Sequence, residues 1–214
     1  MTGRGLRGDR PTSGRDVQAR AAVASPVVAA GRLAGFPPVW RADARLLILG
    51  SFPSIASLGA AQYYAHPRNQ FWPILGRLIG VDLPALAYPE RLEAVKAARV
   101  AIWDVLGSCE REGSLDTAIR DAHANQFDPL LAGLPALRAV AFNGGTAGRA
   151  APWFGERGLH TVRLPSTSPA HAALDLEAKF ARWRVLVDQG WIAGGSDGTE
   201  GGGKERGLHR AAKR

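Results

Sequence analysis

The segment from Leu46 to Trp72 carries the side chains best suited to chemistry. It begins as a short apolar run and breaks at Gly50 into a Ser-Phe-Pro-Ser turn. It then ends in YYAHPRNQFW, which holds two tyrosines, a histidine, an arginine and an asparagine. Loops that follow buried strands are where α/β folds place their binding groups. Few folds need so many aromatic and hydrogen-bonding side chains in one such loop, so the segment predicts an active site.

Asn143 is a candidate for reading a nucleobase. It closes an apolar run and is followed by two glycines. A side-chain amide at that place can donate one hydrogen bond and accept another, which matches the lactam edge of uracil or hypoxanthine. The alternative is that Asn143 only caps a helix beginning at Gly144.

Asp104 follows an apolar run and Asn69 precedes a helical pattern. Each can act in chemistry or can have a purely structural role. Asp104 ends an apolar run, so partial desolvation is expected. It can orient a water, stabilise positive charge, or anchor its loop through Ser108 and Ser114. Asn69 stands just before Phe71, where a helical pattern begins, so capping is its structural alternative.

The loop after the last apolar run places Ser166, Thr167 and Ser168 between two prolines. Hydroxyl groups and backbone N–H groups bind phosphate oxygens well, and proline holds such a loop with little entropy to lose. The alternative is a stiff turn that also caps the last helix.

Spacing argues against several familiar chemistries. His66 and His171 have no second His or Cys at metal-ligand spacing, so no metal site is expected. Ser51 is followed by Phe-Pro, which does not fit the G-x-S-x-G nucleophile elbow. Cys109 is the single cysteine, which excludes an intramolecular disulfide and a four-cysteine cluster.

Apolar runs of strand length alternate with helical patterns through the middle of the chain. The strand candidates are Arg45–Leu49, Arg99–Trp103, Arg138–Phe142 and His160–Leu164. The helix candidates are Phe71–Ile79, Pro89–Ala98, Leu115–Asp121 with Ser114 as its cap, Gly144–Ala151 and Leu174–Asp188. This alternation predicts an α/β three-layer sandwich, with a parallel sheet covered by helices on both faces. Catalytic groups should gather at the carboxyl ends of the strands.

Composition indicates one domain between two basic ends. The 214 residues are 46% hydrophobic, and the formal charge is +8. Lys and Arg outnumber Asp and Glu by 6 to 2 in 1–35 and by 5 to 3 in 194–214, but only by 16 to 14 in 36–193. We therefore expect a flexible leader, a globular domain over 36–193 and a disordered Gly-rich tail. The basic ends are either simply solvated or an electrostatic footprint for nucleic acid.

No targeting or membrane segment is expected. The apolar stretch at 21–30 follows several arginines but lacks Leu, Ile and Phe, which is weak for an export signal. No apolar run reaches the length of a membrane span. We expect a cytoplasmic protein.

Together these residues resemble the uracil-DNA glycosylase superfamily, and most closely its hypoxanthine-DNA glycosylase branch. The resemblance rests on five motifs that occur in the family's order: GSFPS at 50–54, YYAHPRNQFW at 63–72, WDVLGSCEREGSLD at 103–116, FNG at 142–144 and LPSTSPAHA at 164–172. It implies a four-stranded parallel sheet between helices, with double-stranded DNA crossing the strand tips. It also implies a monomer, associated with the nucleoid, that flips a deaminated base into a pocket and hydrolyses its glycosidic bond without metal or cofactor.

The resemblance also implies roles for individual residues. Many relatives hold the attacking water with Asp or Asn in the first motif, but GSFPS has neither, and Asn69 looks like the substitute. Asp104 would be the nearby negative charge or the proton acceptor. Asn143 would read the base edge, and Tyr64 would lie under the flipped base. Three residues, Gly50, Ser51 and Phe52, would shape the base pocket.

Contacts to DNA are implied for the last loop. Ser166 and Ser168 would grip backbone phosphates, and Pro169, Ala170 and His171 would lie in the minor groove. The main expectation is removal of hypoxanthine. Removal of uracil, a non-catalytic module that flips bases, and a generic α/β hydrolase remain alternatives.

Overall fold

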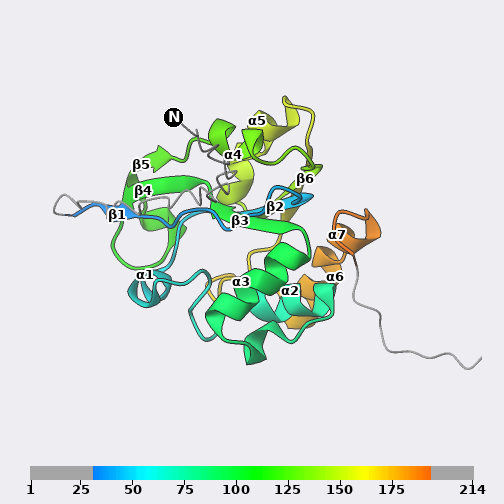
Figure 1. Cartoon of the computed structure of the whole chain (residues 1–214). Helices are drawn as coiled ribbons and strands as arrows, with labels where there is room; N and C mark the ends of the chain where they lie inside the picture. Colours follow the sequence, from blue (N-terminus) through cyan, green and yellow to red (C-terminus); the bar gives the residue numbers. More distant parts are fainter. Residues whose placement is uncertain (1–30, 194–214) are drawn as a thin grey trace, which may run out of the picture.

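Four parallel strands form the central sheet of the computed structural model, which describes residues 31–193 (Figure 1). In chain order they are β2 (Leu46–Gly50), β3 (Val100–Asp104), β6 (Ala139–Asn143) and β7 (His160–Leu164), and their order in the sheet is β3-β2-β6-β7. All three pairings are parallel. The predicted sheet is confirmed, because each predicted strand lies within one residue of its observed bounds.

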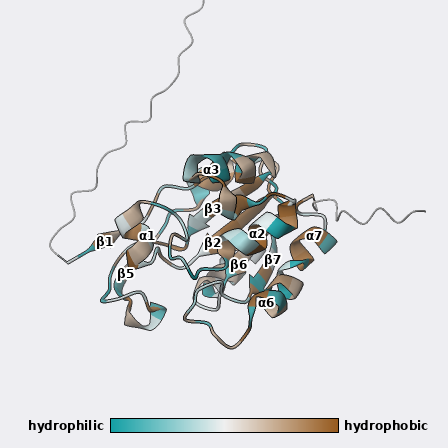
Figure 2. Cartoon of the chain, turned by 90° about the horizontal axis from the view of Figure 1, so that it is seen from below, coloured by the Kyte–Doolittle hydropathy of each residue, from teal (hydrophilic) through white to brown (hydrophobic). Residues whose placement is uncertain are grey.

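Continuous apolar sequence explains why β2, β3 and β6 are buried along their whole length. Every residue of these three strands is buried, which requires side chains that avoid water on both faces. β3 and β7 are the two edge strands of the sheet. Most residues of β7 are exposed or half-buried. Figure 2 shows the hydrophobic colour concentrated in the strands at the centre of the domain.

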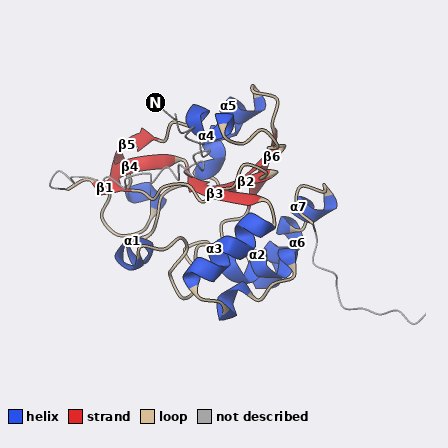
Figure 3. Cartoon of the chain, in the orientation of Figure 1, coloured by secondary structure: helices blue, strands red, loops and turns tan. Residues whose placement is uncertain are grey.

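Helices cover both faces of the sheet, as the three-layer prediction requires (Figures 1 and 3). One face carries α2 (Phe71–Ile79), α3 (Tyr88–Ala97), α6 (Leu176–Trp183) and α7 (Val185–Asp188). The other face carries α4 (Asp128–Ala132) and α5 (Ala151–Gly155). Trp183 is fully buried and donates from Nε1 to the Pro165 carbonyl at 3.1 Å, which ties α6 to the loop after β7.

A second, antiparallel sheet was not predicted. It consists of β1 (Leu33–Ala34), β4 (Leu106–Glu110) and β5 (Arg120–Ala124), in the order β1-β4-β5. All five residues of β5 are exposed, so its sequence has no apolar period. Pairing with β4 through the backbone, rather than burial of side chains, holds this strand. A short helix, α1 (Ile55–Ala60), leads away from the first strand tip.

Three predicted helices are wrong in extent. At Leu115–Asp121 only a 3-10 turn forms, over Asp116–Ala118, and the Ser114 hydroxyl accepts from the Ile55 N–H instead of capping. No helix begins at Gly144, because that residue has φ +104; a 3-10 turn begins at Ala147 and leads into α5. The last helical segment divides into α6 and α7, and the Asp175 carboxylate caps α6 by accepting from the Ala178 N–H at 2.8 Å.

The predicted ends of the chain lie mostly outside the described residues. Of the leader expected over 1–35, residues 31–35 are described, and Leu33–Ala34 within them pairs with β4. The tail expected over 194–214 is not among the described residues. Within 31–193, no helix has both the length and the apolar character needed to cross a membrane.

Gly76 provides a test of the packing between α2 and the following 3-10 turn. Gly-to-Ala changes inside helices usually stabilise by up to about 1 kcal/mol. A Cβ on Gly76, however, would lie 2.5 Å from the Val81 carbonyl oxygen and 3.2 Å from the Leu83 nitrogen. We expect Gly76→Ala to lower the free energy of unfolding by about 1–3 kcal/mol in urea titrations. Gly59→Ala in α1, where nothing lies within 4 Å, is the control and should not destabilise. An equal response of the two variants would contradict this packing.

Candidate active site

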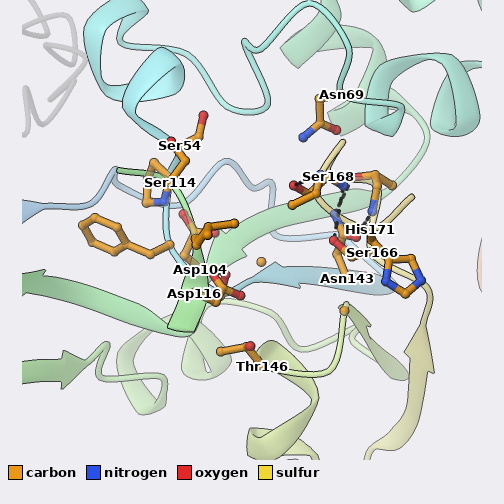
Figure 4. Close-up of a pocket in the computed structure, with 18 of the residues that line it drawn as sticks. Ser54, Asn69, Asp104, Ser114, Asp116, Asn143, Thr146, Ser166, Ser168 and His171 are labelled. Atoms are coloured by element: carbon orange, nitrogen blue, oxygen red, sulfur yellow. Dashed lines mark hydrogen bonds between the residues drawn. The ribbon is translucent and has the colours of Figure 1, made fainter. Parts of the chain in front are cut away.

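A pocket of about 600 Å³ opens at the carboxyl ends of the parallel strands (Figure 4). Its walls come from the tips of β2, β3 and β6, from the loop after β7, and from the 3-10 turn between β4 and β5. Almost every site residue predicted from sequence lines it, namely Gly50, Ser51, Phe52, Tyr64, Asn69, Asp104, Asn143, Ser166, Ser168, Ala170 and His171. Pro169 belongs to the same loop, but it does not line the pocket.

Gly50 is required by the close approach of two side chains. It pairs with Asp104 in the parallel register of β2 and β3. A Cβ on Gly50 would lie 2.4 Å from Asp104 Oδ1 and 3.1 Å from Tyr64 Oη. Since Asp104 Oδ1 lies in the space of a Cβ, only glycine fits at the end of β2.

Tyr64 is held in an unusual backbone conformation. Its φ is +53, in the left-handed region that non-glycine residues rarely adopt. Its ring stacks on Phe71, with centroids 3.7 Å apart and planes 17° from parallel. The buried hydroxyl makes no hydrogen bond of normal geometry among the described residues, although it lies near the Asn143 side chain. Burial raises the pKa of Tyr64 more than Asn143 lowers it, so the phenol stays neutral. One face of the ring is therefore occupied by protein, and the hydroxyl points towards Gly50.

Asp104 is a buried carboxyl group whose pKa is raised by its surroundings. Only 3% of the residue is exposed, and Oδ2 has no hydrogen-bond partner within residues 31–193. Burial, helped by the negative charge of Asp116, raises the pKa of Asp104 to about 7, although Arg111 acts in the opposite direction. The proposed anchoring through Ser108 and Ser114 is absent from the described contacts, since Ser108 meets Arg32 and Ser114 meets Ile55.

Asn143 is held by Thr167 and does not cap a helix. Its Nδ2 donates to Thr167 Oγ1, and its Oδ1 accepts from the Thr167 N–H, both at 2.9 Å. The residue that precedes the following 3-10 turn is Thr146. Both partners are buried, Thr167 completely. The orientation of the Asn143 amide is therefore fixed at the floor of the pocket.

Asn69 lies both at the start of a helix and in the pocket wall. Its Oδ1 accepts from the Phe71 N–H at 3.0 Å, so it stabilises the start of α2, and it also lines the pocket. The neighbouring Gln70 N–H donates to the Thr167 carbonyl at 3.0 Å. This bond joins the Asn69 loop directly to the loop that holds Asn143.

The hydroxyl groups of the last loop organise their own backbone. Ser166 Oγ accepts from the Ser168 N–H at 3.2 Å, and Ser168 Oγ accepts from the Ala170 N–H at 3.3 Å. In each contact the hydroxyl oxygen is the acceptor, so its O–H remains available to donate to an anion. The turn and the phosphate-binding interpretation of this loop are therefore compatible.

Asp116, Thr146 and Arg149 line the pocket but received no role from the sequence. Asp116 accepts from Ser51 Oγ at 2.8 Å, across 65 positions of sequence. Two further pocket residues have contacts other than those predicted, since Thr167 holds Asn143 and Ser114 accepts from the Ile55 N–H. The signal for Asp116 was its place at the end of the WDVLGSCEREGSLD motif. Among residues 31–193, no three His, Cys, Asp or Glu side chains gather in a way that could hold a metal ion.

An α/β sandwich with a pocket at the carboxyl ends of its parallel strands, lined by an amide and a buried carboxyl group, belongs to the class of α/β proteins that bind a ligand at this edge of the sheet. The family model for the uracil DNA glycosylase superfamily matches residues 37–187. This chain belongs to the uracil-DNA glycosylase superfamily.

Relatives that this chain covers over most of their length support this membership. A protein of Methanosarcina barkeri named hypoxanthine DNA glycosylase is 42% identical over 149 residues, which cover 70% of this chain and 94% of that protein. One of the same name from Methanosarcina acetivorans is 42% identical over 137 residues, covering 64% and 87%. A solution NMR structure from Methanosarcina acetivorans, whose name refers to uracil DNA glycosylase, is similar with a TM-score of 0.65 and 38% identity, and the match covers 72% of this chain and 98% of that one.

The burial of Asp104 has a consequence for stability. A carboxyl group whose pKa is raised in the folded state binds its proton more tightly there, so its contribution to stability falls as pH rises from about 4 to above 7. We expect Asp104→Asn to be more stable than the parent protein at pH 8, by up to about 4 kcal/mol, and to lose this advantage near pH 4. Urea unfolding at several pH values measures the difference. Asp82→Asn, at an exposed position, is the control, and a pH-independent gain in Asp104→Asn would contradict the inferred burial of charge.

Proposed function

We propose that this chain removes hypoxanthine from deoxyinosine in double-stranded DNA, hydrolysing the N-glycosidic bond and leaving an abasic site. The observation that carries the proposal is the Asn143 amide, which Thr167 holds in one orientation at the pocket floor. The 42% identity to a hypoxanthine DNA glycosylase, over 94% of that protein, supports the same substrate.

The fixed amide retains a donor for a base carbonyl. A primary amide has two N–H groups and two oxygen lone pairs, and Thr167 uses one of each, on the edge where the N–H and the C=O lie side by side. The remaining N–H points away from that edge and can donate to a carbonyl of hypoxanthine or uracil. Adenine carries an amino donor in place of this carbonyl, so it cannot accept from Asn143.

Asn69 is proposed to orient the attacking water. Its Oδ1 already accepts from the Phe71 N–H, which fixes the direction of its second lone pair and leaves that lone pair for a water. An amide is not a base near neutral pH, so Asn69 positions the water and does not deprotonate it. Asp104 completes the catalytic pair, as the carboxyl group nearest the reacting sugar.

The remaining predicted residues are proposed to hold the DNA. Ser166 and Ser168 would donate their hydroxyl protons to backbone phosphates, and Pro169, Ala170 and His171 would enter the minor groove beside the flipped nucleotide. Gly50, Ser51 and Phe52 would form the wall of the base pocket, together with the hydroxyl end of Tyr64. We further propose that the protein acts as a monomer, in the cytoplasm and on the nucleoid.

Substrate assays test the proposal directly. The purified protein is incubated with labelled duplexes containing deoxyinosine, deoxyuridine or deoxyxanthosine, and abasic sites are then cleaved with alkali. We expect strand breaks with deoxyinosine. Breaks with deoxyuridine alone would assign the activity to uracil, and tight binding without breaks would indicate a non-catalytic module.

Asn69 variants separate catalysis from capping. Asn69→Ser keeps a short side-chain acceptor for the Phe71 N–H but cannot reach as far into the pocket, whereas Asn69→Ala loses both functions. We expect both to lower the single-turnover rate by at least about 100-fold, because the water loses its orientation. Only Asn69→Ala should lower the melting temperature. Activity that followed melting temperature across the two variants would assign Asn69 to structure alone.

Thr167→Val tests the orientation of Asn143. Valine has a similar shape but lacks the hydroxyl that accepts from Asn143 Nδ2, while the backbone N–H contact to Oδ1 remains. Loss of one buried hydrogen bond, worth about 1 kcal/mol, should slow hypoxanthine release about five- to tenfold. Binding of undamaged DNA should not change. Thr161→Val, at an exposed position in β7, is the control, and an equal rate in the two variants would contradict the orienting role.

A further inference from the structure

Asp104 and Asp116 line the same pocket, although one comes from the central sheet and the other from the turn between two strands of the second sheet (Figure 4). Asp104 is the last residue of the central strand β3. Asp116 begins the 3-10 turn that connects β4 and β5 in the antiparallel sheet. Both line the same cavity, and the charge of Asp116 is among the causes that raise the pKa of Asp104.

The surroundings of the two carboxyl groups differ. Asp104 is 3% exposed, and its Oδ2 has no hydrogen-bond partner within the described part of the chain. Asp116 is half-buried, and its Oδ1 accepts a hydrogen bond from Ser51 at 2.8 Å. Two neighbouring carboxyl groups in unequal surroundings take different charges, and the more buried one keeps the proton.

Other charged and titratable groups near Asp104 do not reverse this order. Arg111 favours the ionised form of Asp104, but no hydrogen bond joins the two side chains within the described residues: Nη2 donates to the Pro53 carbonyl, and Nε and Nη1 have no partner there. Tyr63 and Tyr64 face Asp104 from the first loop, and burial keeps both phenols neutral by raising their pKa values. Asn125 donates to the backbone carbonyl of Asp104 and leaves its carboxyl group alone.

We propose that Asp104 is the general acid that protonates the departing purine at N7, and that Asp116 is the positioning residue that keeps this proton in place. The proposal deepens the proposed function and rests on it, because it concerns the leaving group of the same reaction. It assigns to the pocket a preference for bases that can leave neutral after accepting a proton.

The step balances without any further reactant. The Asp104 proton moves to N7, the C1′–N9 bond breaks, and its electron pair stays with the base, which leaves as neutral hypoxanthine. The water adds through its oxygen to C1′ of the cationic sugar. One proton of that water returns through solvent to the Asp104 carboxylate, which restores the starting form.

The charge of the pair would also favour release of purines over release of uracil. Uracil departs as an anion when no acid protonates it, and the ionised Asp116 disfavours a second negative charge in a pocket with little water. A purine protonated at N7 adds no negative charge when it leaves. The carboxyl pair therefore discriminates through the charge of the leaving group, whereas the Asn143 amide recognises a carbonyl that both bases share.

The pH dependence of the single-turnover rate on deoxyinosine duplexes tests the pair. The parent rate should fall as pH rises through about 7, as Asp104 loses its proton. Asp116→Asn removes the negative charge but retains an oxygen that can accept from Ser51. Asp104 then loses its proton more readily, so the fall should move to lower pH by about one unit. Asp82→Asn, an exposed carboxylate change outside the pocket, should leave the profile where it is.

A substrate analogue tests the proton acceptor. Duplexes with 7-deaza-2′-deoxyinosine keep the lactam edge but lack N7, so they should bind normally and resist cleavage. Asp104→Asn should slow deoxyinosine cleavage about 10²- to 10⁴-fold, the usual contribution of a general acid. It should leave the residual rate on the analogue unchanged.

The outcomes separate the two proposals. A parent protein that releases no hypoxanthine at any pH overturns the proposed function. A parent protein that releases hypoxanthine, but whose pH profile does not move in Asp116→Asn, overturns the carboxyl pair alone. Cleavage of the 7-deaza duplex at the parent rate does the same.

Discussion

The burial of the Asp104 carboxyl group against the end of β2 is the constraint on which the pocket depends. Its Oδ1 lies where a Cβ of residue 50 would be, so β2 must end in glycine. The same space receives the hydroxyl of Tyr64, which explains why the first loop turns back sharply through a residue with positive φ. Any side chain at position 50 would have no room there. The buried carboxyl group of the pocket comes from β3, and the proposed water-orienting amide comes from the loop before α2.

The parallel pairing of the strands also fixes where the other pocket residues lie relative to Asp104. Gly50 pairs with Asp104 on one side of β2, and Asn143 pairs with Leu164 at the same edge between β6 and β7. Because the chain leaves β7 at Leu164, Thr167 is close enough to hold both amide atoms of Asn143. Gln70 then ties the Asn69 loop to Thr167. A short series of backbone and side-chain contacts therefore fixes the proposed water-orienting group relative to the proposed base-reading group.

Sequence predicted the central sheet well because its strands are continuous apolar runs buried on both faces. It failed for β4 and β5, since β5 is fully exposed and its stability comes from backbone pairing, which leaves no hydrophobic period. The helix expected at Gly144 failed for a local reason, the positive φ of that residue. Asp116 escaped notice because its contact with Ser51 spans 65 positions and depends on the unpredicted hairpin. Residues at the tips of buried strands could be placed from sequence, whereas groups delivered by exposed hairpins could not.

The second sheet brings a further charge to the pocket. The hairpin between β4 and β5 delivers Asp116, whose negative charge adds to burial in raising the pKa of Asp104. Burial alone disfavours the ionised form of Asp104 and lowers the stability of the fold as pH rises. Adding a second carboxylate increases that cost, and a fold selected only for stability would avoid it. Since Ser51 holds Asp116 in place at the edge of the pocket, the repulsion between the two carboxyl groups is built into the site. Such strain is characteristic of groups whose proton is used in a reaction.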